Sequence, residues 1–100
     1  MTAGTDSFDQ FELRRKSDDL VYRFERKVDA QGRVGYQRAD RDLWIVRSPE
    51  WGWISTDPET GVITGRSWER HPSQQSDHPP TGVWVTRKGD KSYVYDLVYT

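Results

Sequence analysis

Residues 20–38 read LVYRFERKVDAQGRVGYQR, and this stretch decides the fold class. In its first half, apolar side chains recur at every second position and mainly charged ones lie between them. The apolar series is Leu20, Tyr22, Phe24 and Val28. A period of two predicts a half-buried β-strand over residues 20–28. Residues 29–32 have the chemistry of a short turn, so residues 33–38 are expected to return as the partner strand of a hairpin.

The same pattern recurs twice toward the C-terminus. Residues 51–55 and 62–64 flank the turn sequence DPETG at residues 57–61. A proline early in a turn presets φ, and a closing glycine tolerates a left-handed exit. Residues 83–87 and 93–99 flank a further glycine-containing turn. One face of the last strand is expected to carry Tyr93, Tyr95, Leu97 and Tyr99.

Short strands separated by closely spaced turns are typical of antiparallel sheet proteins. We therefore predict an all-β fold, a small antiparallel sandwich or partly open barrel of about six to eight short strands joined by hairpins. Residues 1–10 are expected to be a flexible N-terminal tail. Residues 11–100 are expected to form a single β domain, with a long loop at residues 71–82 where prolines, serines and glutamines gather.

Composition excludes several classes of function. The chain has no cysteine, so it has no disulfide framework, thiol nucleophile or thiolate metal site. Its formal net charge of −1 excludes a strong overall field for DNA or acidic membranes. With no secretion signal and no long apolar run, a cytoplasmic location without membrane contact is expected. No phosphate-binding glycine loop or dinucleotide fingerprint is present, so we expect no cofactor.

Aromatic residues are the strongest functional signal, because 13% of the chain is aromatic and five residues are tryptophan. Trp51 and Trp53 flank a glycine and are expected to form a flat apolar patch on one strand face. Tryptophan, tyrosine and arginine are the residue types that anchor protein interfaces. We predict a non-catalytic recognition domain that binds a protein partner or a second copy of itself. Its proposed contact residues are Trp51, Trp53, Trp44, Trp68 and Arg47. Packing in the core is the alternative for this tryptophan pair.

Two other classes of ligand fit the same aromatic content. In one alternative, the aromatics line a groove or barrel mouth that binds a carbohydrate or another small ligand. In the other, rings at Tyr22 and Phe24 stack on single-stranded nucleic acid beside basic residues. Those basic residues are Arg14, Arg15, Lys16, Arg23, Arg26 and Lys27. Cross-strand pairing with nearby carboxylates explains the same alternation of charge.

The two histidines are weak candidates for chemistry. His71 and His78 are seven positions apart in the proline-rich loop. Joint metal binding usually needs tighter spacing and more ligands nearby, so solvated loop histidines are the favoured interpretation. Ser73 or Ser76 with Asp77 could complete a Ser-His-Asp set. No nucleophile-elbow pattern supports that arrangement.

Four carboxylates could form an oxygen-rich cation site or an acid–base pair. Asp40 and Asp42 would point to the same side of an extended chain. Asp57 and Glu59 are explained by the turn in which they lie. We expect no catalytic residue and no metal site.

Residues 55–65, STDPETGVITG, resemble the turn between two strands of cadherin-like and bacterial Ig-like repeats. Residues 29–36 loosely resemble the strand and turn that precede it in such repeats. Trp68-Glu69-Arg70 stands where the repeats carry an acidic calcium-ligating motif. The likeness spans residues 28–70 and lacks the acidic linker that ends these repeats. It implies a sandwich, with calcium near Glu69.

Overall fold

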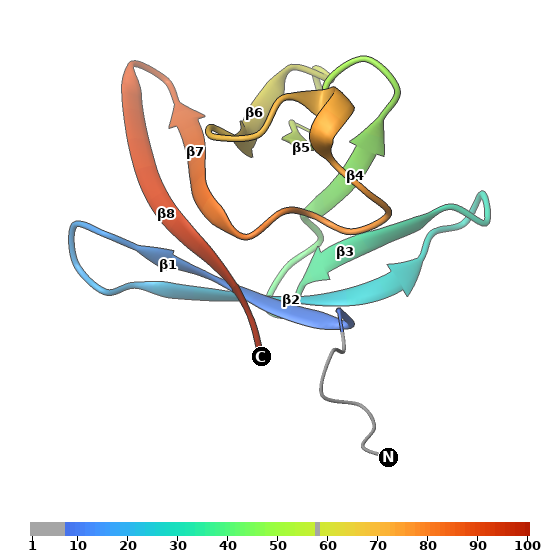
Figure 1. Ribbon diagram of the computed structural model, residues 1–100, viewed down its shortest axis with the longest axis horizontal. Coiled ribbons are helices and arrows are strands. Elements are labelled where there is room, and N and C mark those ends of the chain that lie inside the picture. The colour runs from blue at the N-terminus through green and yellow to red at the C-terminus, as the bar shows by residue number, and fades with distance from the viewer. Residues whose placement is uncertain (1–7, 58) are drawn as a thin grey trace.

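The computed structural model describes residues 8–57 and 59–100. Eight antiparallel strands form one sheet that closes into a barrel (Figure 1). They are β1 (Gln10–Arg15), β2 (Val21–Val28), β3 (Val34–Arg38), β4 (Trp44–Ser48), β5 (Gly52–Thr56), β6 (Ile63–Ser67), β7 (Gly82–Lys88) and β8 (Lys91–Tyr99). A short 3-10 helix, η1 (Pro72–Gln74), lies between β6 and β7. No helix in the described part of the chain is long and apolar enough to cross a membrane.

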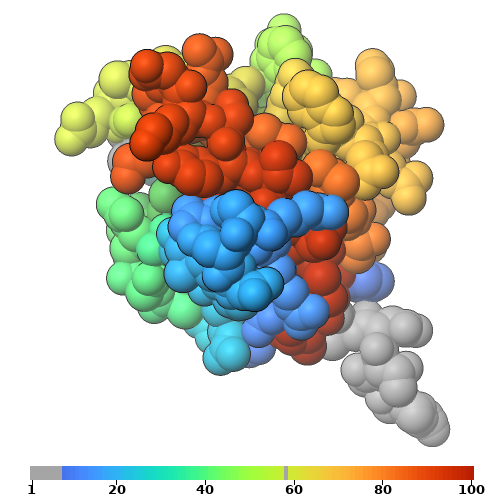
Figure 2. All heavy atoms as spheres, turned by 90° about the vertical axis from the view of Figure 1, so that its left-hand side faces the viewer, coloured from blue at the N-terminus to red at the C-terminus, as the bar shows by residue number. Residues whose placement is uncertain are grey.

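Closure of the barrel rests on pairing between the first and last strands. Phe11 of β1 lies opposite Phe24 of β2 and also opposite Tyr99 of β8. The β1–β2 connection packs against β8 as well, since the backbone N–H of Lys16 donates to the carbonyl of Val94 over 2.9 Å (Figure 2). Every strand therefore has two hydrogen-bonded neighbours.

The all-β antiparallel prediction is confirmed, but the sandwich or partly open barrel is wrong. Local turn signals specify hairpins, and the same hairpins can build a sandwich or a barrel. The difference lies in whether β1 and β8 pair, and these strands lie at opposite ends of the described chain. No local pattern reports such a pairing.

One face of each strand fills the barrel interior. The buried core consists of Phe11, Leu13, Phe24, Tyr36, Ile45, Trp53, Trp84, Tyr95 and Leu97. The predicted inward face of β8 is confirmed, because Tyr93 and Tyr99 also pack against this cluster. The predicted apolar face of residues 20–28 is wrong at both ends, and Leu20, which precedes β2, is exposed. Val28 lies opposite Val34 in a hairpin that extends beyond the core, and both valines are exposed.

The connection between β6 and β7 closes one end of the barrel. Gln75 is buried there, and its Oε1 accepts from the backbone N–H of Trp53 over 2.8 Å. Its Nε2 donates to the carbonyl of Arg70 over 3.1 Å. The indole Nε1 of Trp53 donates to the carbonyl of Ser76 over 3.0 Å. Gly52, at φ 77°, is required beside this contact, because a Cβ there would lie 2.5 Å from Gln75 Oε1.

Aromatic side chains complete this plugged end. The Phe8 ring stacks on His78 with centroids 3.7 Å apart. The hydroxyl of Tyr99 donates to the carbonyl of Pro79, and that of Tyr36 donates to the carbonyl of Phe8. Burial raises the pKa of both tyrosines above the usual range. Of the predicted tail, residues 1–7 lie outside the described residues, and β1 already begins at Gln10.

Candidate functional site

The other end of the barrel contains a cavity of about 380 Å³. The connections that follow β1, β3, β5 and β7 surround it. Its apolar and aromatic lining consists of Leu13, Tyr22, Phe24, Leu43, Ile45, Trp84, Tyr93 and Tyr95. An eight-stranded barrel is just wide enough to be filled by side chains or to hold one small ligand. The volume lies within the range of small-molecule sites in proteins.

Small side chains on β5, β6 and β7 leave this space open. Along the inward face of β5, the large Trp53 is followed by Ser55, and β6 offers Gly65 at the paired position. A register shift between Ser55 and Thr56 places the hydroxyls of Ser55 and Thr64 3.1 Å apart. A Cβ on Gly65 would lie 2.9 Å from Trp84 Nε1, so the glycine also makes room for the indole.

The indole of Trp84 carries an unsatisfied polar group at the cavity. The residue is 1% exposed and lines the cavity. Among the described residues, its Nε1 is the one buried side-chain nitrogen or oxygen without a hydrogen-bond partner. A buried donor left unpaired costs about 1–3 kcal/mol, so such a group is uncommon in a folded protein and requires an explanation. A ligand acceptor atom in the cavity would satisfy it.

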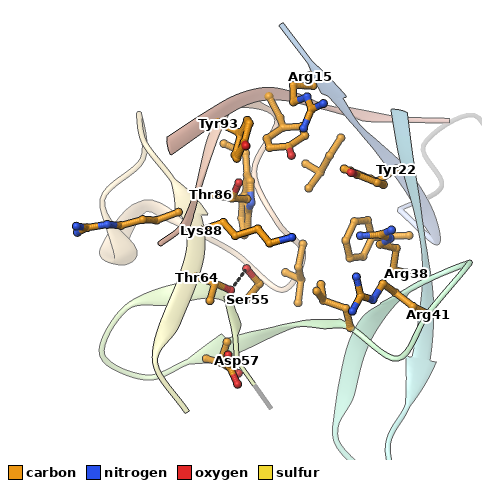
Figure 3. A pocket seen from close by; sticks show the side chains of 18 residues that line it. Arg15, Tyr22, Arg38, Arg41, Ser55, Asp57, Thr64, Thr86, Lys88 and Tyr93 are labelled. Carbon is orange, nitrogen blue, oxygen red and sulfur yellow. Dashed lines mark hydrogen bonds between the residues drawn. The ribbon is translucent and has the colours of Figure 1, made fainter. Parts of the chain in front are cut away.

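The cavity mouth is strongly cationic, although the whole chain has a net charge of −1. Its basic lining residues are Arg15, Arg38, Arg41, Arg87 and Lys88. Figure 3 labels four of them, Arg15, Arg38, Arg41 and Lys88. In that lining, Asp57 is the single carboxylate. Asp57 is occupied by its own turn, since its Oδ1 accepts from the backbone N–H groups of Glu59 and Thr60.

Two of these cations are held in place by local ion pairs. Arg15 makes hydrogen bonds of 2.8 and 2.6 Å to the two carboxylate oxygens of Asp18. Arg38 donates from Nη2 to Asp40 over 3.0 Å and lies 3.9 Å above the ring of Tyr22. These arginine hydrogen bonds hold the pKa of Asp18 and of Asp40 below the usual range. Arg15 and Arg38 are therefore fixed parts of the cavity wall.

The proposed tryptophan patch is not assembled as expected. Trp53 is 2% exposed and belongs to the core, so it does not share a surface with Trp51. The positive φ of Gly52 breaks the alternation that would have put them on one face. Trp51 and Trp68 are 42% and 66% exposed, and Arg66 lies 5.9 Å from the Trp51 ring. The expected contact surface therefore loses one of its two central members.

The two remaining members of that predicted set lie elsewhere. Trp44 is half-buried, and its Nε1 donates to Asp42 over 2.8 Å. Arg47 is exposed at the plugged end, where it lies 3.5 Å from the carbonyl of Gln75. None of the five predicted contact residues lines the cavity.

Each basic residue of the predicted strip lies near a carboxylate, in some cases on a neighbouring strand and in others on the same strand or turn. Arg23 and Arg14 both pair with Glu12, and Lys16 pairs with Asp96. The remaining ion pairs of the strip are Arg26 with Asp9, Lys27 with Glu25 and Arg15 with Asp18. Arg15 is the member of the strip that lines the cavity.

The histidines and the acidic candidates have structural partners. His78 stacks on Phe8, and its Nδ1 lies 3.0 Å from Asp77. His71 caps η1 by accepting from the backbone N–H of Ser73. Asp42 accepts from Gln37 as well as from Trp44. In the described residues, no group of three or more histidines, aspartates or glutamates is placed to hold a metal ion.

Sequence reasoning missed the cavity, although a signal for it exists. Along the inward faces, polarity rises toward the same end of the barrel. The series are Phe11-Leu13-Arg15, Tyr36-Arg38, Trp53-Ser55-Asp57 and Trp84-Thr86-Lys88. These four strands run in the same direction, so each series becomes more polar toward its C-terminal end, and closure of the barrel brings those ends together.

Comparison of the chain with protein-family models, with curated proteins and with solved structures finds no match. The resemblance to cadherin-like and bacterial Ig-like repeats stays a prediction.

Proposed function

We propose that the protein is a non-catalytic binding domain that takes one small, largely apolar molecule into the open end of its barrel. The observation that carries this proposal is the cavity, which combines an aromatic lining with the unpaired N–H of Trp84. This proposal corresponds to the alternative, given above, in which the aromatic residues line a site for a small ligand. The rings that face inward, and not the exposed ones, would make the contacts.

The chemistry of the lining favours binding over filling by water. Phe24, Ile45, Trp84 and Tyr95 are nearly fully buried and offer apolar walls. A ligand that removes about 200 Å² of apolar surface from water there gains about 5 kcal/mol, before the cost of immobilisation. The hydroxyls of Ser55, Thr64 and Thr86, with the N–H of Trp84, supply a few polar contacts that orient it.

A neutral fluorescent probe tests this proposal. N-phenyl-1-naphthylamine becomes bright in an apolar environment and carries no charge. We expect saturable binding to one site in the folded protein. Thr86→Phe, which fills the cavity, should weaken binding about tenfold or more, because the probe loses apolar contacts there.

Thr81→Phe is the matched control, since Thr81 is exposed and does not line the cavity. Its affinity should equal that of the unsubstituted protein, and circular dichroism checks that both variants fold. Absence of saturable binding to the unsubstituted protein would refute the proposal. Equal binding by Thr86→Phe would refute the location.

Protein recognition is a second candidate function, favoured by the exposure of Trp51 and Trp68. Arg66 lies 5.9 Å from the Trp51 ring, and tryptophan and arginine are residue types that anchor interfaces. For a second copy as the partner, sedimentation should show a dimer that Trp51→Ser combined with Trp68→Ser converts to a monomer. A monomeric unsubstituted protein at all concentrations would exclude that partner.

A further inference from the structure

Building on the proposed function, we infer that the ligand is an organic anion. Its apolar body would occupy the cavity, and its acidic group, a carboxylate, sulfonate or phosphate, would lie at the mouth between Arg41 and Lys88. The inference adds a charge requirement that an apolar cavity alone does not impose.

This inference rests on which basic side chains at the cavity mouth already have a hydrogen-bond or ion-pair partner and which do not. Arg15 and Arg38 are neutralised by Asp18 and Asp40. Arg87 donates from Nε to the carbonyl of Gly89 over 3.2 Å. By contrast, the side chains of Arg41 and Lys88 make no hydrogen bond and no ion pair at contact distance with any described residue, although the charge of Arg41 acts on nearby Asp40 and helps to lower the pKa of that carboxyl.

The two unpaired cations approach one space from different elements. Arg41 comes from the β3–β4 connection and Lys88 from the end of β7. Both line the cavity, and Figure 3 shows their charged ends extending toward its centre beside that of Arg38. A planar guanidinium and a mobile ammonium can together bind one acidic group by charge-assisted hydrogen bonds.

The surroundings strengthen this attraction. The walls below the mouth are apolar, and low-dielectric walls focus the field of charges of one sign. The single lining carboxylate, Asp57, is occupied by backbone N–H groups of its turn. Because Arg15 and Arg38 are paired with carboxylates, the excess positive charge at the mouth comes from Arg41, Arg87 and Lys88, in a chain whose overall charge is slightly negative. An entering anion would meet a positive potential followed by an apolar site.

A pair of probes that differ in one acidic group tests the inference. N-phenyl-1-naphthylamine is neutral, and 8-anilinonaphthalene-1-sulfonate has the same ring system with a sulfonate. We expect the sulfonate to bind about tenfold more tightly at low salt, and added salt to reduce that preference. Each probe should displace the other from a single site.

Substitution of the two cations localises the effect. Arg41→Gln combined with Lys88→Gln should remove the preference for the sulfonate while leaving the affinity of the neutral probe unchanged. Arg70→Gln combined with Lys27→Gln is the control of equal charge change, since both residues are exposed and outside the cavity. The control should keep the preference.

The outcomes separate the two proposals. If neither probe binds, the proposed function fails, and the inference fails with it. If the neutral probe binds but the sulfonate has no advantage, the inference fails and the proposed function stands. A preference that survives Arg41→Gln with Lys88→Gln would also overturn the inference, because the anion would then be held elsewhere.

Discussion

Gly65 shows how one missing side chain shapes the site. A Cβ there would lie 2.5 Å from Ser55 Oγ and 2.9 Å from Trp84 Nε1. Neither group can move away easily, because the Ser55 hydroxyl is buried and hydrogen-bonded to Thr64 and the indole is packed in the core. Gly65→Ala should therefore lower the free energy of unfolding by about 1–3 kcal/mol through overpacking. Urea unfolding measures this loss.

Ser55→Ala provides the internal control for that contact. Removing the hydroxyl relieves the shorter of the two clashes, so the double variant should lose less stability than the sum of the single variants. Strict additivity would contradict the close approach described between Gly65 and Ser55.

Tyr99 is a second residue whose environment has a measurable consequence. Burial raises its pKa, so the folded state favours the neutral phenol. That contribution is fully present below the ordinary tyrosine pKa, about 10, and is lost as pH rises above it. The urea midpoint should therefore change little from this cause up to about pH 9 and fall as the pH rises from there to about 11.

Tyr99→Phe should make that decline less steep. The variant should also lose about 1 kcal/mol of stability at neutral pH, because the carbonyl of Pro79 loses its donor. A decline of unchanged steepness in the variant would show that Tyr99 does not cause it.

Among the elements, the β6–β7 connection departs furthest from an ordinary surface loop. Gln75 reaches into the barrel end and accepts from the buried N–H of Trp53. Gln75→Ala should cost about 1–3 kcal/mol of unfolding free energy, because that N–H loses its partner. Gln74→Ala is the matched control, since Gln74 is exposed and its side chain bonds only to the neighbouring His71. Equal effects of the two substitutions on the urea midpoint would contradict the plugging role.

At the scale of the whole molecule, closure of the barrel gives each of the eight described strands a hydrogen-bonded neighbour on both sides. Amide hydrogen exchange in β1 and β8 should therefore be as slow as in β2 and β7, because both sides of each strand are bonded. Mass spectrometry of peptic peptides measures this directly. Fast exchange confined to β1 and β8 would indicate an open sheet.

The assembled barrel also explains which features of the fold and of the site could be predicted from the sequence alone. The alternation at Tyr22 and Phe24 and the turn at residues 57–61 predict hairpins correctly, because both signals are local. Burial of Trp53 beside an exposed Trp51 depends on the backbone of Gly52 and on Gln75, which lies 22 positions further along the chain. The cavity depends on eight strands contributing side chains at one level. These are properties of the assembled barrel.

Mapping the bound probe by nuclear magnetic resonance tests the central claim most directly. Titration of isotope-labelled protein with N-phenyl-1-naphthylamine should shift the backbone amide signals of Ser55, Thr86 and Tyr95, which line the open end of the barrel. Signals near Trp51 and Trp68 should stay in place. Shifts confined to those exposed tryptophans, with none at the cavity, would contradict the account.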